Sequence, residues 1–302
     1  MVKINNMNIL VTGSNGFIGR HLCNKLQSYN ANEVYKIDNF STSIQNKLSI
    51  EMDITNSLCA EKILRDIGKV DIVYHLGSPC SNIQFTEDKN MINRTLAGFS
   101  NIIDYCKRSD AKLIFPSSGN VYGNSRSTSE NKSIPIPTND YSKTKIKAEN
   151  MVKESGLNYM CLRIFLGYGP GEELKGRLSS VVYQFLNDIR NNNSPIIWGN
   201  GMQTRDYVYI DDIVQCLINA IDCNNMTINI GTGISFNFID LIKMINKILN
   251  KDIIPKFIEA PNNYVINAKA NNVLSRKHLR IKYTPIEYGI KTFNRYLNDK
   301  KL

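Results

Sequence analysis

The sequence VTGSNGFIGR at residues 11–20 decides the fold that we predict for this chain. Three glycines in it lie between an apolar run at residues 8–11 and a helical pattern of apolar residues that starts at Phe17, so a strand turns into a helix across them. In a dinucleotide site the first glycine permits a tight turn, the second lets the backbone approach a pyrophosphate, and the third lets helix and strand pack closely. The glycines are Gly13, Gly16 and Gly19. The pyrophosphate would meet the free N–H groups at the start of the helix.

A second strand and an acidic residue follow at the distance that a dinucleotide site requires. Taken alone, the glycines could form an ordinary turn, because their spacing is Gly-x-x-Gly-x-x-Gly rather than Gly-x-Gly-x-x-Gly. The second strand, predicted at residues 34–37, ends at Asp38, which lies 19 residues after Gly19. A carboxylate there would accept both ribose hydroxyls of the adenosine half of NAD and repel a 2′-phosphate. No arginine occurs at residues 39–43, so we predict NAD(H) rather than NADP(H).

Strands and helices alternate along the chain, which predicts an α/β fold with a doubly wound parallel sheet covered on both faces. Further strands are predicted at residues 49–52, 71–75 and 112–115, and helices at about 57–67 and 90–108. The polar stretch at residues 124–132 predicts a loop.

The composition is typical of a globular protein. With 302 residues, of which 42% are hydrophobic and 21% charged, the chain can form one large core or two modest domains. Residues 1–8 contain no apolar segment of signal-peptide length and no run of eighteen apolar residues follows, so we expect a cytoplasmic protein. Seven cysteines without a Cys-x-x-Cys pair predict reduced core thiols, and three isolated histidines without metal-ligand spacing predict no metal.

The formal net charge of +10 is compatible with nucleic acid, an anionic membrane or small anionic ligands. The sequence has no basic run with interleaved aromatic residues and no basic amphipathic helix, so we expect neither a nucleic-acid partner nor a membrane partner. The scattered lysines are typical of a solvated surface, and a diphosphate substrate would benefit mildly from their field.

A second group of residues, Tyr141, Lys145 and Ser118, predicts acid–base chemistry. Tyr141 and Lys145 are four residues apart on a segment with helical character, so their side chains share one face. An adjacent ammonium, helped by the charge of an oxidised nicotinamide, would lower the pKa of the tyrosine and make it a useful base. A Tyr-x-x-x-Lys pair alone is also common on surfaces. Ser118, at the carboxyl end of a predicted strand, favours the catalytic alternative because its hydroxyl could share a substrate oxygen with Tyr141.

In these motifs the chain resembles the nucleotide-sugar epimerases and dehydratases of the extended short-chain dehydrogenase/reductase family, a group that is similar to UDP-glucose 4-epimerase. Matches run through almost the whole chain: residues 11–19, 38–43, 53–54, 75–77, Asn93, 117–118, 121–123, Tyr141 with Lys145, 162–165, 168–171, 198–212 and 229–233.

The resemblance implies a Rossmann-type NAD-binding domain at residues 1–165 and a smaller α/β lobe, mainly residues 166–302, that binds a nucleotide-diphosphate sugar, with the chain crossing back between the two. It implies a homodimer through the helices near residues 90–108 and 140–155. The implied catalytic residues are Tyr141, Lys145 and Ser118, and the implied substrate contacts are Ser118, Tyr141 and Arg205. The implied NAD contacts are Gly13, Asn15, Gly16, Phe17, Ile18, Gly19, Asp38, Asn39, Ser41, Thr42, Asp53, Ile54, Leu76, Gly77, Ser78, Asn93, Ser117, Tyr141 and Lys145.

The segment that ends at Arg205 predicts an anion loop. Glycines free its backbone, and the arginine offers a bidentate fork to phosphate oxygens. The alternative is a structural surface pair between Arg205 and Asp206. Downstream, we expect Asp211 or Asp212 to cap the helix that follows.

Three departures from the family pattern bear on the substrate. Leu166 stands where the family usually has asparagine, and residues 261–264 lack the usual arginine and Gly-Asp pair, so Lys269, Arg276 or Arg280 could rebuild the diphosphate site. Gly119-Asn120 replaces the Asp-Glu pair of 4,6-dehydratases, which disfavours dehydration.

We therefore expect an NAD-dependent enzyme that transiently oxidises C4 of a nucleotide-activated sugar, with 4-epimerisation as the first hypothesis. An NAD(P)H-dependent reductase of a 4-keto sugar nucleotide uses the same three residues and stays open, as does a non-catalytic NAD or nucleotide sensor. Because Leu166 cannot donate a hydrogen bond, we expect weak or no activity on UDP-galactose. We expect a preference for another sugar nucleotide, such as a deoxy, acetamido or heptose derivative.

Overall fold

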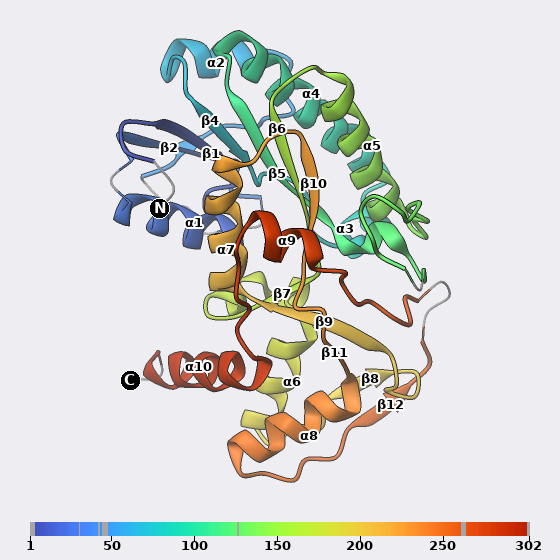
Figure 1. Cartoon of the computed structure of the whole chain (residues 1–302). Coiled ribbons are helices and arrows are strands. Elements are labelled where there is room, and N and C mark those ends of the chain that lie inside the picture. The colour runs from blue at the N-terminus through green and yellow to red at the C-terminus, as the bar shows by residue number, and fades with distance from the viewer. Residues whose placement is uncertain are drawn as a thin grey trace.

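The computed structural model describes residues 4–29, 31–41, 43, 48–125, 127–260 and 264–300, which form two lobes (Figure 1). Within these ranges, none of the helices is long and apolar enough to cross a membrane.

A seven-stranded parallel sheet forms the larger lobe, which confirms the predicted doubly wound α/β fold. Its strand order is β10-β6-β5-β4-β1-β2-β3. The strands are β1 (Asn8–Thr12), β2 (Glu33–Asp38), β3 (Ile50–Glu51), β4 (Ile72–His75), β5 (Lys112–Ser118), β6 (Tyr159–Ile164) and β10 (Met226–Ile230). Strands β2 and β3 are added on one side of β1. Strands β4, β5, β6 and β10 are added on its other side. The order reverses between β1 and β4, which is where open α/β sheets bind ligands, beyond the carboxyl ends of their strands.

Helices cover both faces of this sheet (Figure 1). One face carries α2 (Cys59–Asp66), α4 (Met91–Ser109) and α5 (Asp140–Glu154), and the other carries α1 (Phe17–Ser28) and α7 (Ile210–Asn219). Successive strand residues point to opposite faces, so Leu10 packs with the α4 side while Ile9 and Val11 pack with the α1 side. Burial on both faces explains why these strands consist of continuous apolar runs.

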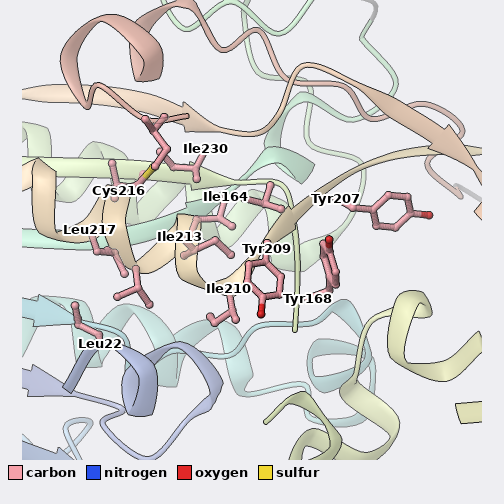
Figure 2. Close-up of a cluster of buried hydrophobic side chains, with 14 of the residues drawn as sticks. Leu22, Ile164, Tyr168, Tyr207, Tyr209, Ile210, Ile213, Cys216, Leu217 and Ile230 are labelled. Atoms are coloured by element: carbon pink, nitrogen blue, oxygen red, sulfur yellow. The ribbon is translucent and has the colours of Figure 1, made fainter. Parts of the chain in front are cut away.

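The core on the α1 and α7 side continues into the smaller lobe, so one apolar cluster joins the two lobes. Figure 2 shows part of it, with side chains from α1, β6, β7, β9, α7 and β10. Tyr168 and Tyr209 meet edge to face there, with ring centroids 5.7 Å apart.

The smaller lobe contains two small sheets and three longer helices. The three-stranded sheet has the order β11-β9-β7, and β12 pairs with β8 in a two-stranded sheet. The elements are β7 (Leu166–Tyr168), α6 (Val181–Arg190), β8 (Ile196–Trp198), β9 (Thr204–Tyr209), β11 (Ser235–Asn237), α8 (Phe238–Leu249), β12 (Lys256–Ile258) and α10 (Ile286–Asp299). Only Phe165 separates β6 from β7, and β10 returns to the large sheet, so the chain passes between the lobes more than once.

The helices of fewer than eight residues were not predicted. They are α3 (Asn82–Glu87), η1 (Gly119–Tyr122), η2 (Glu172–Leu178), η3 (Ala220–Asp222) and α9 (Val273–His278). Each spans fewer than eight residues, which is too short for helical periodicity to show in the sequence.

The capping role expected for Asp211 or Asp212 is wrong. Helix α7 begins at Ile210 after Tyr209, and no side chain caps it. Both aspartates lie in its first turn, and the Asp212 carboxylate instead accepts hydrogen bonds from the backbone N–H and the hydroxyl of Thr284. Asp212 thereby fixes the segment that leads into α10.

Candidate active site

A cavity of about 890 Å³ opens beyond the carboxyl ends of β1, β4 and β5 and is lined by residues of both lobes. Its volume is in the range of small-molecule and cofactor sites. The cavity lies at the point where the strand order of the large sheet reverses, as expected for a nucleotide-binding α/β fold.

The glycine loop forms one wall, and its shape leaves no room for side chains. A Cβ added to Gly13, whose φ is +67°, would lie 2.5 Å from the backbone nitrogen of Gly77. A Cβ added to Gly19 would lie 2.1 Å from the carbonyl oxygen of Gly13. Gly16 precedes α1, and no side chain caps the N–H groups at the start of that helix. These features fit a dinucleotide pyrophosphate, which needs close backbone approach and free helix N–H groups.

Asp38 ends β2 beside this loop. One carboxylate oxygen accepts the backbone N–H of Asn15 at 2.9 Å, and the other accepts the N–H of Phe40 and the hydroxyl of Ser43, both at 2.8 Å. These donors fix the carboxylate at the edge of the cavity.

Most of the residues predicted to contact NAD line this one cavity. They are Gly13, Gly16, Phe17, Ile18, Gly19, Asp38, Asn39, Ser41, Asp53, Ile54, Leu76, Gly77, Ser78, Ser117, Tyr141 and Lys145. Asn15 is buried and does not line the cavity, and its side-chain nitrogen has no hydrogen-bond partner among the described residues. Thr42 lies outside the described residues.

The structure does not support the predicted contact between Asn93 and NAD. Its side chain is exposed, donates to Asn90 and does not line the cavity. Two residues further along α4, the buried Thr95 lines the cavity instead. Because each helical residue advances by 100°, a step of two residues moves a side chain to nearly the opposite side of the helix.

The predicted acid–base residues Tyr141 and Lys145 lie on the first turns of α5. Asn139 and Ser142 form a capping box that fixes the start of this helix. The Lys145 Nζ atom donates to Ser78 Oγ at 2.6 Å and lies 5.7 Å from the centroid of the Tyr141 ring. Tyr141 also forms a side-chain hydrogen bond with Ser118, at the end of β5. The structure thus brings the three predicted catalytic residues together, facing the glycine loop.

Burial dominates the electrostatics of this group. It raises the pKa of Tyr141 well above its usual value, while the hydrogen bond with Ser118 opposes that rise. Burial also lowers the pKa of Lys145 to about 8. Lys145 by itself does not offset this rise, so the expected phenolate depends also on the positive charge of an oxidised nicotinamide.

A buried network holds α5 against the sheet. Glu149 accepts hydrogen bonds from Ser117 Oγ at 2.6 Å and from the Arg163 Nε and Nη2 atoms at 2.9 and 2.7 Å. The Arg163 Nη1 atom donates to the Tyr122 hydroxyl, which donates to Asn229 of β10. Since Glu149 lies one helical turn after Lys145, this network fixes the register of the helix that carries the acid–base pair.

Arg205 reaches the cavity from β9. Its guanidinium lies between two aromatic rings, 5.6 Å from the centroid of Phe238 and 5.2 Å from that of Tyr264. The proposed surface pair with Asp206 is wrong, because Asp206 is fully buried and accepts hydrogen bonds from Thr232, Gly233 and Ala270. The arginine is thus available to an anion in the cavity.

The structure does not support the predicted second cation of the diphosphate site. Lys269, Arg276 and Arg280 are not among the residues that line the cavity, whereas Arg94 and Lys175 are. Leu166 lines it as expected, while residues 261–263 lie outside the described part of the chain.

Several lining residues were missed by sequence reasoning. Phe165 follows the Leu-Arg-Ile run that the resemblance singled out, so a signal for it existed. Trp198, Phe238 and Tyr264 come from separate segments of the smaller lobe, and no local pattern connects them. Trp198 is the single tryptophan of the chain, and its ring meets that of Tyr264 edge to face at 5.7 Å.

A site of this kind, in which a tyrosine and a lysine face a glycine loop at the reversal of a parallel sheet, defines a dinucleotide-dependent enzyme of the Rossmann class. Residues 9–231 match the model of the NAD dependent epimerase/dehydratase family, and the chain belongs to this family.

Individual relatives agree in sequence and structure. A putative UDP-glucose 4-epimerase of Methanocaldococcus jannaschii is 32% identical over 241 residues, which cover 74% of this chain and 77% of the relative. UDP-glucuronic acid decarboxylase 3 of Arabidopsis thaliana is 30% identical over 277 residues, 84% of this chain and 78% of the relative. The crystal structure of UDP-glucose 4-epimerase from Thermotoga maritima with UDP-glucose has a TM-score of 0.92 at 26% identity, covering 98% of this chain and all of that one.

Proposed function

We propose that the protein is an NAD-dependent 4-epimerase of a nucleotide-diphosphate sugar. The observation that carries the proposal is the group of Tyr141, Lys145 and Ser118, which faces the glycine loop across one cavity. We assign NAD binding to residues 1–165, through the predicted contacts that line the cavity. Sugar-nucleotide binding is assigned mainly to residues 166–302, with Arg205 as a diphosphate ligand.

In this proposal NAD, when bound, supplies a hydride acceptor and donor beside the sugar. Tyr141 takes the proton of the 4-hydroxyl as C4 becomes a ketone, and Ser118 hydrogen-bonds the same oxygen. Lys145, together with the positive charge of an oxidised nicotinamide, offsets the burial that raises the pKa of Tyr141 and favours the phenolate. After the sugar presents its other face, Tyr141 returns the proton to the 4-oxygen. Atoms and charge balance, because the proton held by Tyr141 and the hydride that the bound cofactor would accept from C4 both return to the sugar.

Replacing Tyr141 by phenylalanine tests this role. We expect kcat for interconversion of the 4-epimers to fall by about 10²–10⁴-fold, as for the loss of a general base. The affinity for NADH, followed by its fluorescence, should stay near that of the wild type, since phenylalanine keeps the ring that lines the cavity and removes only the hydroxyl placed at the reacting oxygen. A variant that keeps most of its turnover removes Tyr141 from the mechanism.

The alternatives predict different fates for the cofactor. A reductase of a 4-keto sugar nucleotide would release oxidised cofactor in each cycle, whereas the epimerase works with retained NAD and needs no added cofactor once loaded. A non-catalytic sensor would bind NAD and turn over nothing in a broad panel of sugar nucleotides. The amount of free NAD released per product formed separates these cases.

We propose a substrate other than UDP-glucose or UDP-galactose. The support is Leu166, an apolar side chain that lines the cavity and cannot hydrogen-bond a sugar hydroxyl. A thermal-shift screen of nucleotide diphosphates and sugar nucleotides with NAD present tests the proposal, because ligands that bind the folded state raise Tm. The largest shift should come from a deoxy, acetamido or heptose derivative. Efficient interconversion of UDP-glucose and UDP-galactose would contradict this specificity.

We also propose a cytoplasmic homodimer that pairs through α4 and α5. These helices lie side by side on one face of the large sheet (Figure 1). Sedimentation at micromolar concentration tests the dimer, and a monomeric mass would rule it out.

A further inference from the structure

The segment that carries Lys175 is fixed against the first helix of the other lobe. The Arg20 Nη2 atom on α1 donates to the carbonyl oxygen of Gly171 at 2.9 Å. One residue further along α1, the Nε2 atom of His21 lies 2.8 Å from the carbonyl oxygen of Pro170. Both acceptors come directly before η2 (Glu172–Leu178). The start of η2 therefore has a defined position relative to α1.

This attachment places the Lys175 ammonium at the start of α1. Its Nζ atom lies 5.4 Å from the centroid of the Phe17 ring, and Phe17 is the first residue of that helix. Lys175, Phe17 and the neighbouring Gly16 and Ile18 all line the cavity. The start of a helix attracts anions through its free N–H groups and its dipole. An anion bound there would thus have a lysine from the other lobe within its reach.

Lys175 retains hydrogen-bonding capacity for such an anion. Its side chain is 23% exposed, and its Nζ atom lies 3.3 Å from one carboxylate oxygen of Glu172. Glu172 is fully buried and also accepts hydrogen bonds from the backbone N–H and the hydroxyl of Ser180, so it does not depend on the lysine alone. An ammonium has three donors, and one suffices for Glu172.

The other cations that line the described cavity make their contacts away from the start of α1. Lys145 donates to Ser78, Arg94 pairs with Asp88 at 3.3 Å, and the Arg205 guanidinium lies between two aromatic rings. Lys175 is the one that stands over the first residue of α1. A dinucleotide pyrophosphate bound to the free N–H groups of α1 would therefore lie beside this lysine.

We propose that Lys175 is a cofactor ligand: it binds the NAD pyrophosphate from the smaller lobe, opposite the glycine loop, and so holds the dinucleotide between both lobes. The inference rests on NAD binding at the glycine loop. It supplies a physical basis for the cofactor retention that an epimerase requires.

The test compares full-length Lys175→Gln and Lys175→Arg with the wild type, using NADH fluorescence to measure cofactor affinity. Lys243→Gln is the matched control, because Lys243 is a 74% exposed lysine on α8 outside the cavity lining. We expect Lys175→Gln to raise the Kd for NADH by about ten-fold or more, as for the loss of a charge-assisted hydrogen bond. Lys175→Arg and the control should stay within about three-fold of the wild type. The Kd of the wild type should also rise more steeply with salt than that of Lys175→Gln.

A second measurement, with UDP, distinguishes the pyrophosphate of the cofactor from that of the substrate. UDP binding is followed by the emission of Trp198, and we expect Lys175→Gln to leave its Kd unchanged. Loss of UDP affinity with unchanged NADH affinity would assign the lysine to the substrate and overturn the proposal, as would an NADH Kd within about two-fold of the wild type. Because NADH binding is measured without any sugar, its outcome is independent of the proposed epimerase activity. If Lys175→Gln fails to fold, retention of NADH affinity in Lys175→Met overturns the proposal equally.

Discussion

Lys145 and Ser78 are joined by a 2.6 Å hydrogen bond that ties the ammonium of α5 to the loop after β4. The lysine is only 5% exposed, and one neutral hydroxyl, that of Ser78, accepts a hydrogen bond from it. A charge is thus held in the interior at a position that chemistry requires and that burial disfavours.

The first prediction concerns the pH dependence of stability. Burial lowers the pKa of Lys145 to about 8, below its ordinary value of 10.5, so the folded protein releases this proton at a lower pH than the unfolded chain. Between these values the unfolded chain binds more protons, and the contribution of Lys145 to the free energy of unfolding rises by about 1.4 kcal/mol per pH unit. The cost of the buried charge is fully present below pH 8.

The measurement is urea unfolding of wild type and Lys145→Met from pH 7 to pH 10.5, the range that spans both pKa values. We expect the difference in free energy of unfolding, variant minus wild type, to be largest at pH 7 and to shrink above pH 8. Taking the difference cancels Lys112, whose pKa burial also lowers to about 8. A difference that does not change with pH would show that Lys145 keeps an ordinary pKa.

The second prediction uses the single tryptophan of the chain. Trp198 is 42% exposed and lines the cavity next to Tyr264, on the same side as Arg205. We expect UDP to change its emission in a saturable way and NAD alone to leave it unchanged. Tyr264→Leu should weaken the response to UDP, because the variant removes the ring that packs against Trp198. Equal responses to both ligands would place the nucleotide of the substrate elsewhere.

The third prediction concerns Gly119 and Phe165. A Cβ on Gly119 would lie 2.9 Å from three ring atoms of Phe165, and both residues line the cavity beside Ser118. We expect Gly119→Ala to cost about 1–3 kcal/mol of stability by overpacking and to lower turnover. Adding Phe165→Leu should recover part of the stability, with a coupling of at least about 0.5 kcal/mol in a double-mutant cycle. Strict additivity would mean that the ring moves aside at no cost.

The fourth prediction concerns the buried ion pair of Glu149 and Arg163, which are 1% and 4% exposed. Glu149→Ala leaves the guanidinium buried without its carboxylate, so we expect a loss of about 3–5 kcal/mol in urea unfolding. Replacing both residues by methionine should cost less than the single change, since it leaves no unpaired charge. If the double variant is the less stable one, the pair contributes more than the charge compensation argued here.

The sequence predicted the features that are local. The glycine loop, the strand ending at Asp38 and the helical spacing of Tyr141 and Lys145 each depend on a few neighbouring residues, and the structure has them as expected. The doubly wound sheet followed because alternating strands and helices admit few arrangements.

The predictions that failed depended on which side of a helix a residue faces or on partners far away in the sequence. Asn93 lies two residues from Thr95, and that offset decides which side chain faces the cavity. The Asp212 carboxylate is bound by Thr284, 72 residues away, which no capping pattern indicates. Lys175 lies on a segment that is attached through Gly171 to Arg20 of α1, 151 residues earlier in the chain, and no local pattern indicates that contact.

Strand β10 completes the large sheet with a segment that the chain makes only after β7, α6, β8 and β9 of the smaller lobe. It pairs with β6 over five residues, from Met226 opposite Met160 to Ile230 opposite Ile164. A fragment that stops after Phe165 would expose the apolar edge of β6, which is the kind of unpaired strand that templates aggregation. Residues up to Phe165 therefore do not contain all the strands of the large sheet. During synthesis on the ribosome the large sheet stays incomplete until residue 230 has emerged, so this sheet and the chain between β6 and β10 have to fold as one unit.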